Sequence, residues 1–296
     1  MTATDIEALH ALAATAVRAV AAQHLPGVGQ PRPLDGYSNL LLKVEPFPLV
    51  ARVVTAEMAR VRTGPTWLGR EVALGRYLAR RNAATVPPAT LLPAGPHEVD
   101  GIAFTFWQYL EIGPIPPTPR ETGAALRSLH ESLMGCPVAL PAMAVIDETD
   151  RMLARPDART KLGPMHSATI DAVAAQIRLA LAERRLHGRA LHGDAHHGNL
   201  WRVGERLVWG DLEDAQMGPI EWDLAAMTAS SVVLGTGGAA ADALASYGAP
   251  FDAALLRVMI KARTLQGLAW AFVGLPDPMA SPRLQSRLRW LAAQAA

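Results

Sequence analysis

The sequence has few of the features that mark several large protein classes. Its single cysteine, Cys136, excludes an internal disulfide and suits a reducing compartment. The formal net charge of +1 gives no electrostatic argument for a nucleic-acid partner. No apolar run reaches the length of a membrane span, and Asp5, Glu7 and Arg18 interrupt the N-terminal segment where a secretory signal would be continuously apolar. We therefore expect a cytoplasmic protein with no membrane partner.

Two common kinds of active site also find little support. His192, His196 and His197 suggest zinc, but no second cluster of Cys, His or carboxylates has the spacing of a familiar zinc motif. No Gly-x-Ser-x-Gly segment follows a predicted strand, which argues against a serine hydrolase of that type.

The sequence does contain enough apolar material for two modest lobes, since 50% of its 296 residues are hydrophobic. Strand and turn signals dominate up to about residue 110, helical periodicity dominates afterwards, and the proline-rich segment 112–119 separates the two regions. We therefore predict an α+β protein with an N-terminal lobe, residues 1–111, and a C-terminal lobe, residues 112–296.

The N-terminal lobe is predicted to hold an antiparallel five-stranded sheet plus helices. A helical face runs from Ile6 towards His24, and a second helix follows the early strands. Polar turns are predicted at Gly95-Pro96-His97 and at Asp100-Gly101. The strand signals fall at 40–44, 49–54, 89–92 and 102–110.

The C-terminal lobe is predicted to be mainly helical. Its one strand pair is a short hairpin, 200–203 with 206–209. Helical patterns occur at 120–133, 167–185, 221–233, 253–272 and 282–294.

A polar loop beside this hairpin has the residues of a phosphoryl-transfer site. Asp194 and Asn199 precede the first strand and Asp211 follows the second, so the hairpin brings three oxygen-bearing side chains together. Phosphoryl transfer needs a carboxylate near the nucleophile and oxygen ligands for Mg²⁺. Gly193 and Gly198 would allow the loop backbone angles closed to other residues. For any one of the three polar residues alone, capping of a turn is an equally good interpretation.

These residues and several others, in the same chain order, resemble the aminoglycoside phosphotransferase family, the small-molecule branch of the protein-kinase-like fold. That family has a glycine-containing nucleotide loop, a basic residue on the third strand and a glutamate on the following helix. The resemblance covers nearly the whole chain. The matching segments are Gly36-Tyr37-Ser38-Asn39, Arg52, Glu71, Leu129-His130, His192-Gly193-Asp194, Asn199, Asp211-Leu212-Glu213 and Trp222-Asp223.

The resemblance implies a bilobal protein-kinase-like fold with catalysis in the larger lobe. Asp194 would accept or orient the proton of the substrate hydroxyl, while Asn199 and Asp211 would bind Mg²⁺. His192 and Asp223 would support the catalytic loop, the Asp223 carboxylate holding its backbone. An N-cap of the following helix is the alternative role for Asp223.

For the nucleotide, ATP or GTP, the resemblance implies a site in the N-terminal lobe. The Arg52 guanidinium would bridge Glu71 and the α and β phosphates, whereas a solvated strand residue is the alternative interpretation. The loop formed by Gly36, Tyr37, Ser38 and Asn39 would cover the phosphates. Adenine would bind the backbone of Gln108 and Leu110.

The predicted partner is a small molecule that presents a hydroxyl group: an aminoglycoside-like antibiotic, a sugar or an amino alcohol. His197, Glu213 and Asp214 are candidate substrate contacts, although exposed turn carboxylates are a simpler account of the two acids. Residues 112–296 hold 18 acidic and 18 basic side chains, so the larger lobe shows no excess of acid for a polycation. A nucleotide-binding pseudokinase with a regulatory role is the alternative function, and the retained Asp194 and Asp211 argue against it.

Overall fold

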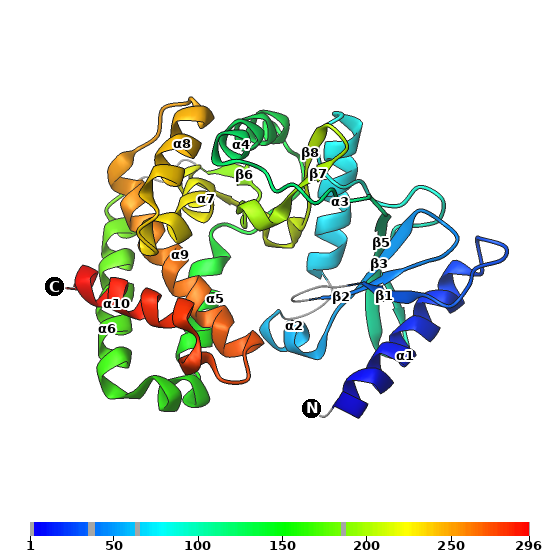
Figure 1. Cartoon of the computed structure of the whole chain (residues 1–296), viewed down its shortest axis with the longest axis horizontal. Coiled ribbons are helices and arrows are strands. Elements are labelled where there is room, and N and C mark those ends of the chain that lie inside the picture. The colour runs from blue at the N-terminus through cyan, green and yellow to red at the C-terminus, as the bar shows by residue number, and fades with distance from the viewer. Residues whose placement is uncertain (1–2, 35–38, 63–65, 185–187, 296) are drawn as a thin grey trace. The chain divides into compact units, whose positions relative to one another are not determined.

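The computed structural model describes residues 3–34, 39–62, 66–184 and 188–295, which form two compact units (Figure 1). The first unit comprises Met1–Gly113 with Val203–Trp209, and the second comprises Pro114–Arg202 with Gly210–Ala296. The predicted α+β class is confirmed, because the first unit contains a five-stranded sheet and the second is mainly helical. Within the described ranges, no helix is long and apolar enough to cross a membrane.

The sheet of the first unit has the strand order β1-β2-β3-β5-β4, and every neighbouring pair is antiparallel. The predicted turn at Asp100-Gly101 joins its last two strands. Both residues have positive φ, 51° and 77°, as a tight two-residue hairpin turn requires. The elements are α1 (Ala3–Ala21), β1 (Arg32–Leu34), β2 (Leu40–Lys43), β3 (Leu49–Val53), α2 (Ala56–Val61), α3 (Thr66–Arg80), β4 (His97–Val99), β5 (Ile102–Gln108) and β8 (Arg206–Trp209).

One predicted strand is wrong. Residues 89–92 form no strand, and β4 lies further along the chain. The Ala89 N–H donates to Phe106 O, and the Phe106 N–H donates to Ala94 O. The residues between Ala89 and Ala94 therefore form a loop whose two ends are hydrogen-bonded to Phe106 of β5. The prolines at positions 87, 88 and 93 lack the N–H groups that a continuous ladder would need.

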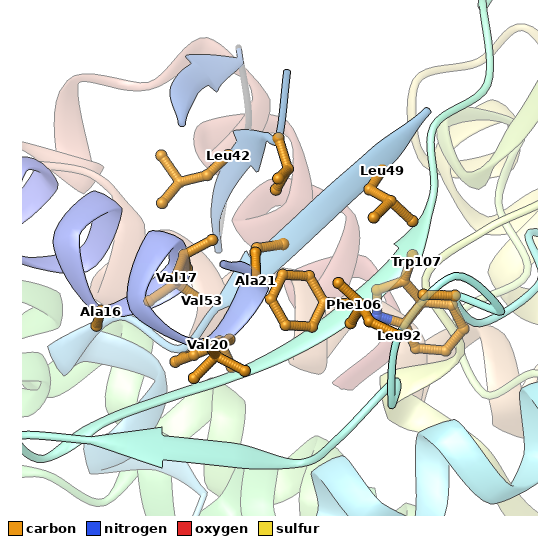
Figure 2. Close-up of a cluster of buried hydrophobic side chains, with 14 of the residues drawn as sticks. Ala16, Val17, Val20, Ala21, Leu42, Leu49, Val53, Leu92, Phe106 and Trp107 are labelled. Atoms are coloured by element: carbon orange, nitrogen blue, oxygen red, sulfur yellow. The ribbon is translucent and has the colours of Figure 1, made fainter. Parts of the chain in front are cut away.

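The core of the first unit lies between α1 and the sheet (Figure 2). The buried residues of α1 recur one turn apart along a single face, which explains the helical periodicity of the sequence. In β2 and β3 the buried positions include alternate residues, so the same apolar face meets the helix. Residues labelled in this core are Ala16, Val17, Val20, Ala21, Leu42, Leu49, Val53, Leu92, Phe106 and Trp107.

The second unit contains the helices that support the polar loop. The predicted hairpin of β7 and β8 is confirmed. The sequence did not reveal α5, α8 or the β6–β9 pair, and the helix predicted at 167–185 is the second part of α6, which kinks at Gly163 (φ 71°). The elements are α4 (Pro119–Leu133), α5 (Ala144–Leu153), α6 (Pro156–Ala182), β6 (Arg189–Leu191), η1 (His197–Asn199), β7 (Leu200–Val203), η2 (Leu212–Asp214), β9 (Gln216–Gly218), α7 (Glu221–Val233), α8 (Gly237–Tyr247), α9 (Ala253–Gly274), η3 (Pro278–Ala280) and α10 (Pro282–Ala295).

A glycine fixes the close packing of α4 against α8. A Cβ atom at Gly123 would lie 2.0 Å from the backbone oxygen of Ala243, so no larger residue fits between these two backbones. In the same unit, α7 packs on α8 and on α9. Side chains from α4, α7 and α9 are thereby held where they can meet the loop between β6 and β7.

Candidate active site

Asp194 and Asn199 contact each other in the loop between β6 and β7. Asn199 Nδ2 donates to the backbone oxygen of Asp194 at 3.0 Å and to its Oδ2 at 3.1 Å. Among the described residues, none donates a hydrogen bond to the side-chain oxygen of Asn199. The two side chains are therefore locked together, and one oxygen remains available as a ligand.

Asp211 is joined to the same loop through the backbone. The Gly210 N–H donates to Asn199 O at 2.9 Å, one residue before Asp211. A Cβ atom at Gly210 would lie 2.2 Å from the Trp201 indole, so this approach requires glycine. Asp211 itself has φ 57° and ψ 63°, a left-handed conformation that is uncommon for a residue with a side chain. The structure thus brings together the three predicted oxygen-bearing residues.

Asp223 holds the backbone of the loop between β6 and β7 from a fully buried position. Its Oδ1 accepts the Gly193 N–H, and its Oδ2 accepts the His192 N–H, both at 2.9 Å. His130 Nε2 lies 2.9 Å from the same Oδ2. The alternative role as an N-cap is wrong, because Ile220 is the N-cap of α7 and Asp223 lies within its first turn.

The His192 side chain connects the two halves of the site. It is completely buried, and its Nε2 donates to Gly210 O at 2.8 Å. Its Nδ1 accepts the Asp194 N–H at 3.3 Å. The His192 imidazole therefore connects Gly210, the residue before Asp211, with the backbone of Asp194.

Gly193 and Gly198 are required in this loop for different physical reasons. Gly193 has φ +86°, and a Cβ there would lie 1.8 Å from Asp214 O, so both conformation and space require glycine. Gly198 does not have the positive φ that the sequence interpretation assumed. A Cβ at Gly198 would instead lie 2.7 Å from the His196 ring, whose Nδ1 accepts the Gly198 N–H.

Arg263 of α9 forms an ion pair with Asp194 that sequence reasoning missed. Arg263 Nη2 donates to Asp194 Oδ1, and Arg263 Nη1 donates to Gln266 Oε1. His196 Nε2 lies 3.4 Å from the other carboxylate oxygen of Asp194. Burial favours a higher pKa for the Asp194 carboxyl, but the charges of Arg263 and His196 outweigh it and hold this pKa below its usual range. Asp194 is therefore ionised at neutral pH.

The three predicted substrate contacts differ in exposure. His197 is exposed on η1, and partial desolvation lowers its pKa, with smaller contributions from the charges of His196 and Arg283. Glu213 is only 8% exposed in η2, so an exposed turn carboxylate is the wrong interpretation for it. Asp214 is half-buried at the end of the same short helix.

In the first unit, Arg52 and Glu71 form a buried ion pair. Arg52 Nη1 donates to both carboxylate oxygens of Glu71 at 2.5 Å, and the two residues are 7% and 3% exposed. The Arg52 guanidinium also lies 5.5 Å from the ring centroid of Trp67. The solvated-strand interpretation of Arg52 is therefore wrong.

The remaining predicted nucleotide contacts lie on backbone that the structure describes only in part. Gly36, Tyr37 and Ser38 lie outside the described residues, and Asn39 is buried directly before β2. The Gln108 N–H donates to Pro87 O, so only the carbonyl of Gln108 is left to bind another partner. In the described ranges, no acceptor is bonded to the N–H of Leu110.

Comparison with known proteins assigns the chain to a family. The model of the phosphotransferase enzyme family, abbreviated APH, matches residues 65–259, which is more than half of the chain. The chain belongs to this family. It has no significant match among curated proteins.

Solved structures show the fold of this family member. Amicoumacin kinase in complex with AMP-PNP, Ca²⁺ and its antibiotic is 15% identical, with a TM-score of 0.67, and the match covers 90% of this chain and 87% of that one. Choline kinase from Streptococcus pneumoniae is 14% identical, with a TM-score of 0.67 and coverage of 93% and 96%. The GDP complex of an aminoglycoside 2'-phosphotransferase is 14% identical, with a TM-score of 0.63 and coverage of 95% and 98%. The chain has the same protein-kinase-like fold.

The donor atoms of this phosphotransferase fit a magnesium ion. Asn199 and Asp211 offer amide and carboxylate oxygens, the hard ligands that Mg²⁺ prefers. In the part of the chain that the structure describes, no three Cys, His, Asp or Glu side chains gather as a metal site. A magnesium ion held here would complete its octahedron with phosphate oxygens and water, as it usually does in phosphoryl-transfer enzymes.

The network around the loop between β6 and β7 contains further contacts that the phosphotransferase resemblance did not predict. Trp222 Nε1 donates to Gly193 O at 2.7 Å, and Tyr247 Oη lies 2.9 Å from His130 Nδ1. A weak signal for a buried polar contact did exist on α9, because Gln266 is a polar residue on the buried face of this helix, one turn after Arg263. Such residues need partners, but the sequence does not say which.

Proposed function

We propose that this phosphotransferase moves the γ-phosphate of ATP to a hydroxyl group of a small molecule in the presence of Mg²⁺. The observation that carries the proposal is that Asp194 and Asn199, before the β7–β8 hairpin, lie beside Asp211, which follows it. Asn199 donates its amide N–H groups to Asp194, and its backbone oxygen accepts the N–H of Gly210, directly before Asp211. This arrangement supplies a carboxylate for the nucleophile and oxygen ligands for a cation side by side.

Each residue of the loop then has a defined task. The ionised Asp194 would orient the acceptor hydroxyl and receive its proton as the bond to phosphorus forms. Asn199 and Asp211 would hold Mg²⁺, which, when bound, offsets the negative charge of the phosphates. Asp223 and His192 would keep the loop in position through the backbone bonds described above.

We assign nucleotide binding to residues 1–111 and catalysis and acceptor binding to residues 112–296. In the N-terminal lobe, the Arg52 guanidinium, oriented by Glu71, is suited to phosphate oxygens. The backbone carbonyl of Gln108 and the N–H of Leu110 are available for adenine or guanine. Similar structures contain AMP-PNP or GDP, so both ATP and GTP are to be tested as donors.

The experiment measures nucleotide consumption and the mass gain of one phosphate group on members of a panel of hydroxyl compounds. Asp194→Ala should lower kcat by about 10²-fold to 10⁴-fold, because it removes a positioned general base. Asp211→Asn should raise the Mg²⁺ concentration needed for half-maximal rate. Asp242→Asn, on the exposed surface of α8, is the matched control and should leave the rate unchanged.

Nucleotide binding is measured separately from turnover. If the wild type binds ATP and GTP but transfers phosphate to no acceptor, the enzyme proposal is wrong and the pseudokinase alternative takes its place. If Asp194→Ala turns over as fast as Asp242→Asn, the assignment of the base is wrong.

A further inference from the structure

Three arginines from two helices lie close to one another, since the charges of Arg263 and Arg283 both act on Arg287. Arg263 lies on α9 and contacts Asp194 directly. Arg283 and Arg287 lie one turn apart on α10, which packs against α9 (Figure 1). We refer to these three residues as the arginine cluster.

The packing of α9 and α10 sets the position of Arg287. Its Nη1 donates to Gly267 O at 3.3 Å, and a Cβ at Gly267 would lie 3.1 Å from its Cζ. Gly267 lies one turn after Arg263 on the same face of α9, so it makes room for a second guanidinium beside the first. A larger residue at position 267 would press on the Arg287 side chain.

The arginine cluster has an excess of positive charge over its described partners. Asp194 pairs with Arg263, whereas within the described residues no carboxylate pairs with Arg283 or Arg287. Asp277, in the segment between α9 and α10, accepts the Ala280 N–H instead. Burial lowers the pKa of the Arg287 guanidinium, and the charges of Arg263 and Arg283 lower it further. The two neighbouring guanidinium groups thus disfavour the charge of the half-buried Arg287, and an anion bound beside it would offset their repulsion.

The histidines beside Asp194 add to this charge pattern. His196 lies 3.4 Å from Asp194, its ring centroid is 6.1 Å from that of His197, and the Arg283 charge acts on His197. Of the two candidate acidic contacts for a cationic acceptor, Glu213 is buried and Asp214 is half-buried. A polycation would meet arginine and histidine here, whereas an anion would find planar guanidinium donors.

We propose that the acceptor of this enzyme carries an anionic group, a carboxylate or a phosphate, that Arg283 and Arg287 bind while its hydroxyl lies at Asp194. This inference rests on the proposed phosphotransferase function and names the substrate class of the same site. Arg263 links the two parts, because it contacts the base and lies one turn from Gly267, where Arg287 is bound. Sugar acids and hydroxy acids belong to this class, whereas choline-like cations do not.

The first experiment sorts acceptors by charge. A metabolite extract is separated by ion exchange into anionic, neutral and cationic fractions, and each fraction is incubated with the enzyme, ATP and Mg²⁺. The anionic fraction should gain phosphorylated product, detected as a mass increase of one phosphate group. Treatment of that fraction with a phosphatase beforehand distinguishes the source of the charge: lost activity indicates a phosphate, and retained activity indicates a carboxylate.

The second experiment tests the arginine cluster with the acceptor so found. Arg287→Gln removes a charged donor and should raise the KM for the acceptor about 10-fold to 100-fold, with kcat and the KM for ATP little changed. Arg283→Glu reverses a charge at an exposed position and should have an effect in the same direction without disturbing the fold. Arg289→Gln is the matched control, because Arg289 is exposed on the same helix and donates to Ser286.

The outcomes separate this inference from the function on which it rests. If the neutral or cationic fraction holds the acceptor, the enzyme is a kinase and the anionic-acceptor inference is wrong. If Arg283→Glu and Arg287→Gln raise the KM for ATP instead, the arginine cluster serves the nucleotide and the inference is equally wrong. If no fraction supports transfer, the proposed function itself fails.

Discussion

Replacing Asp223 by asparagine tests the buried network that holds the catalytic loop. The Asp223 Oδ1 accepts one N–H, from Gly193, whereas Oδ2 is shared by the His192 N–H and His130. Asparagine fits best with its oxygen in the place of Oδ2, which keeps two contacts. Its NH₂ group then faces the Gly193 N–H, so a donor meets a donor and one charge-assisted bond is lost.

The expected loss of stability follows from the one hydrogen bond that Asp223→Asn removes. A hydrogen bond to a charged group contributes about 1.5–3 kcal/mol, and the buried N–H left without an acceptor adds to the cost. We therefore expect Asp223→Asn to lower the free energy of unfolding by about 2–4 kcal/mol. Movement of Asp194 with its loop should also lower kcat by about 10-fold to 100-fold, since catalysis depends on near-ångström positioning.

The assay is urea unfolding followed by tryptophan fluorescence, together with kcat for the identified acceptor. Asp242→Asn is the control, because its surface pair with Arg120 is exposed and such pairs contribute about 0–1 kcal/mol. Equal unfolding midpoints for Asp223→Asn and Asp242→Asn would refute the reasoning. A destabilised variant with unchanged kcat would show that the network stabilises the fold without positioning the base.

Three further predictions concern other charged or tightly packed positions. Glu71→Gln removes the carboxylate that pairs with the buried Arg52 and should cost about 3–5 kcal/mol in urea unfolding, and adding Arg52→Met should restore most of the loss. Hydrogen bonds from the α4 N-cap residue lower the pKa of Glu121 from 4.5 to about 2, so its stabilising effect is present above pH 4.5 and disappears as the pH falls towards 2. The difference in urea midpoint between wild type and Glu121→Gln should therefore be full at pH 7 and shrink over that range. Gly193→Ala should cost about 2–4 kcal/mol and abolish turnover, whereas Gly204→Ala, with φ +58° but open space, should cost only about 1 kcal/mol.

Local patterns in the sequence predicted much of the fold. The hairpin of β7 and β8 has the predicted boundaries, because a Gly-containing turn joins two short runs of strand-forming residues. The Asp100-Gly101 turn was equally clear, since both residues tolerate positive φ. In each case the signal and the structure lie within a few consecutive residues.

Features that depend on distant partners were missed. The strands β6 and β9 have three residues each and pair across 24 intervening residues, so neither shows a periodic pattern of its own. The helix α8 is rich in alanine and glycine and lacks a polar face, because it packs closely on α4 at Gly123. Segment 89–92 has strand-forming composition, but the neighbouring prolines remove the hydrogen-bond donors.

In the candidate site, too, the sequence predicted the residues that lie close together in the chain and missed a residue that contacts them from a distant helix. Asp194, Asn199 and Asp211 lie close in sequence around one hairpin, and their spacing alone suggested convergence. The long-range role of Asp223 came from a family resemblance, since nothing local connects it to Gly193. Neither source indicated Arg263, because a helical pattern identifies a buried face but not the loop that it meets.

The ion pair between Arg263 and Asp194 bears on how the base works. A general base is most effective when its pKa lies near the working pH, yet the Arg263 charge holds the pKa of Asp194 below the usual range of a carboxyl. Asp194 is thus a weak proton acceptor and a strong hydrogen-bond acceptor. Phosphoryl transfer tolerates this combination, because its transition state is loose and depends mainly on positioning and charge stabilisation. Under the proposed function, Asp194 would therefore serve chiefly to orient the acceptor hydroxyl, and the Arg263 charge that weakens it as a base would also belong to the arginine cluster on which an anionic acceptor would lie.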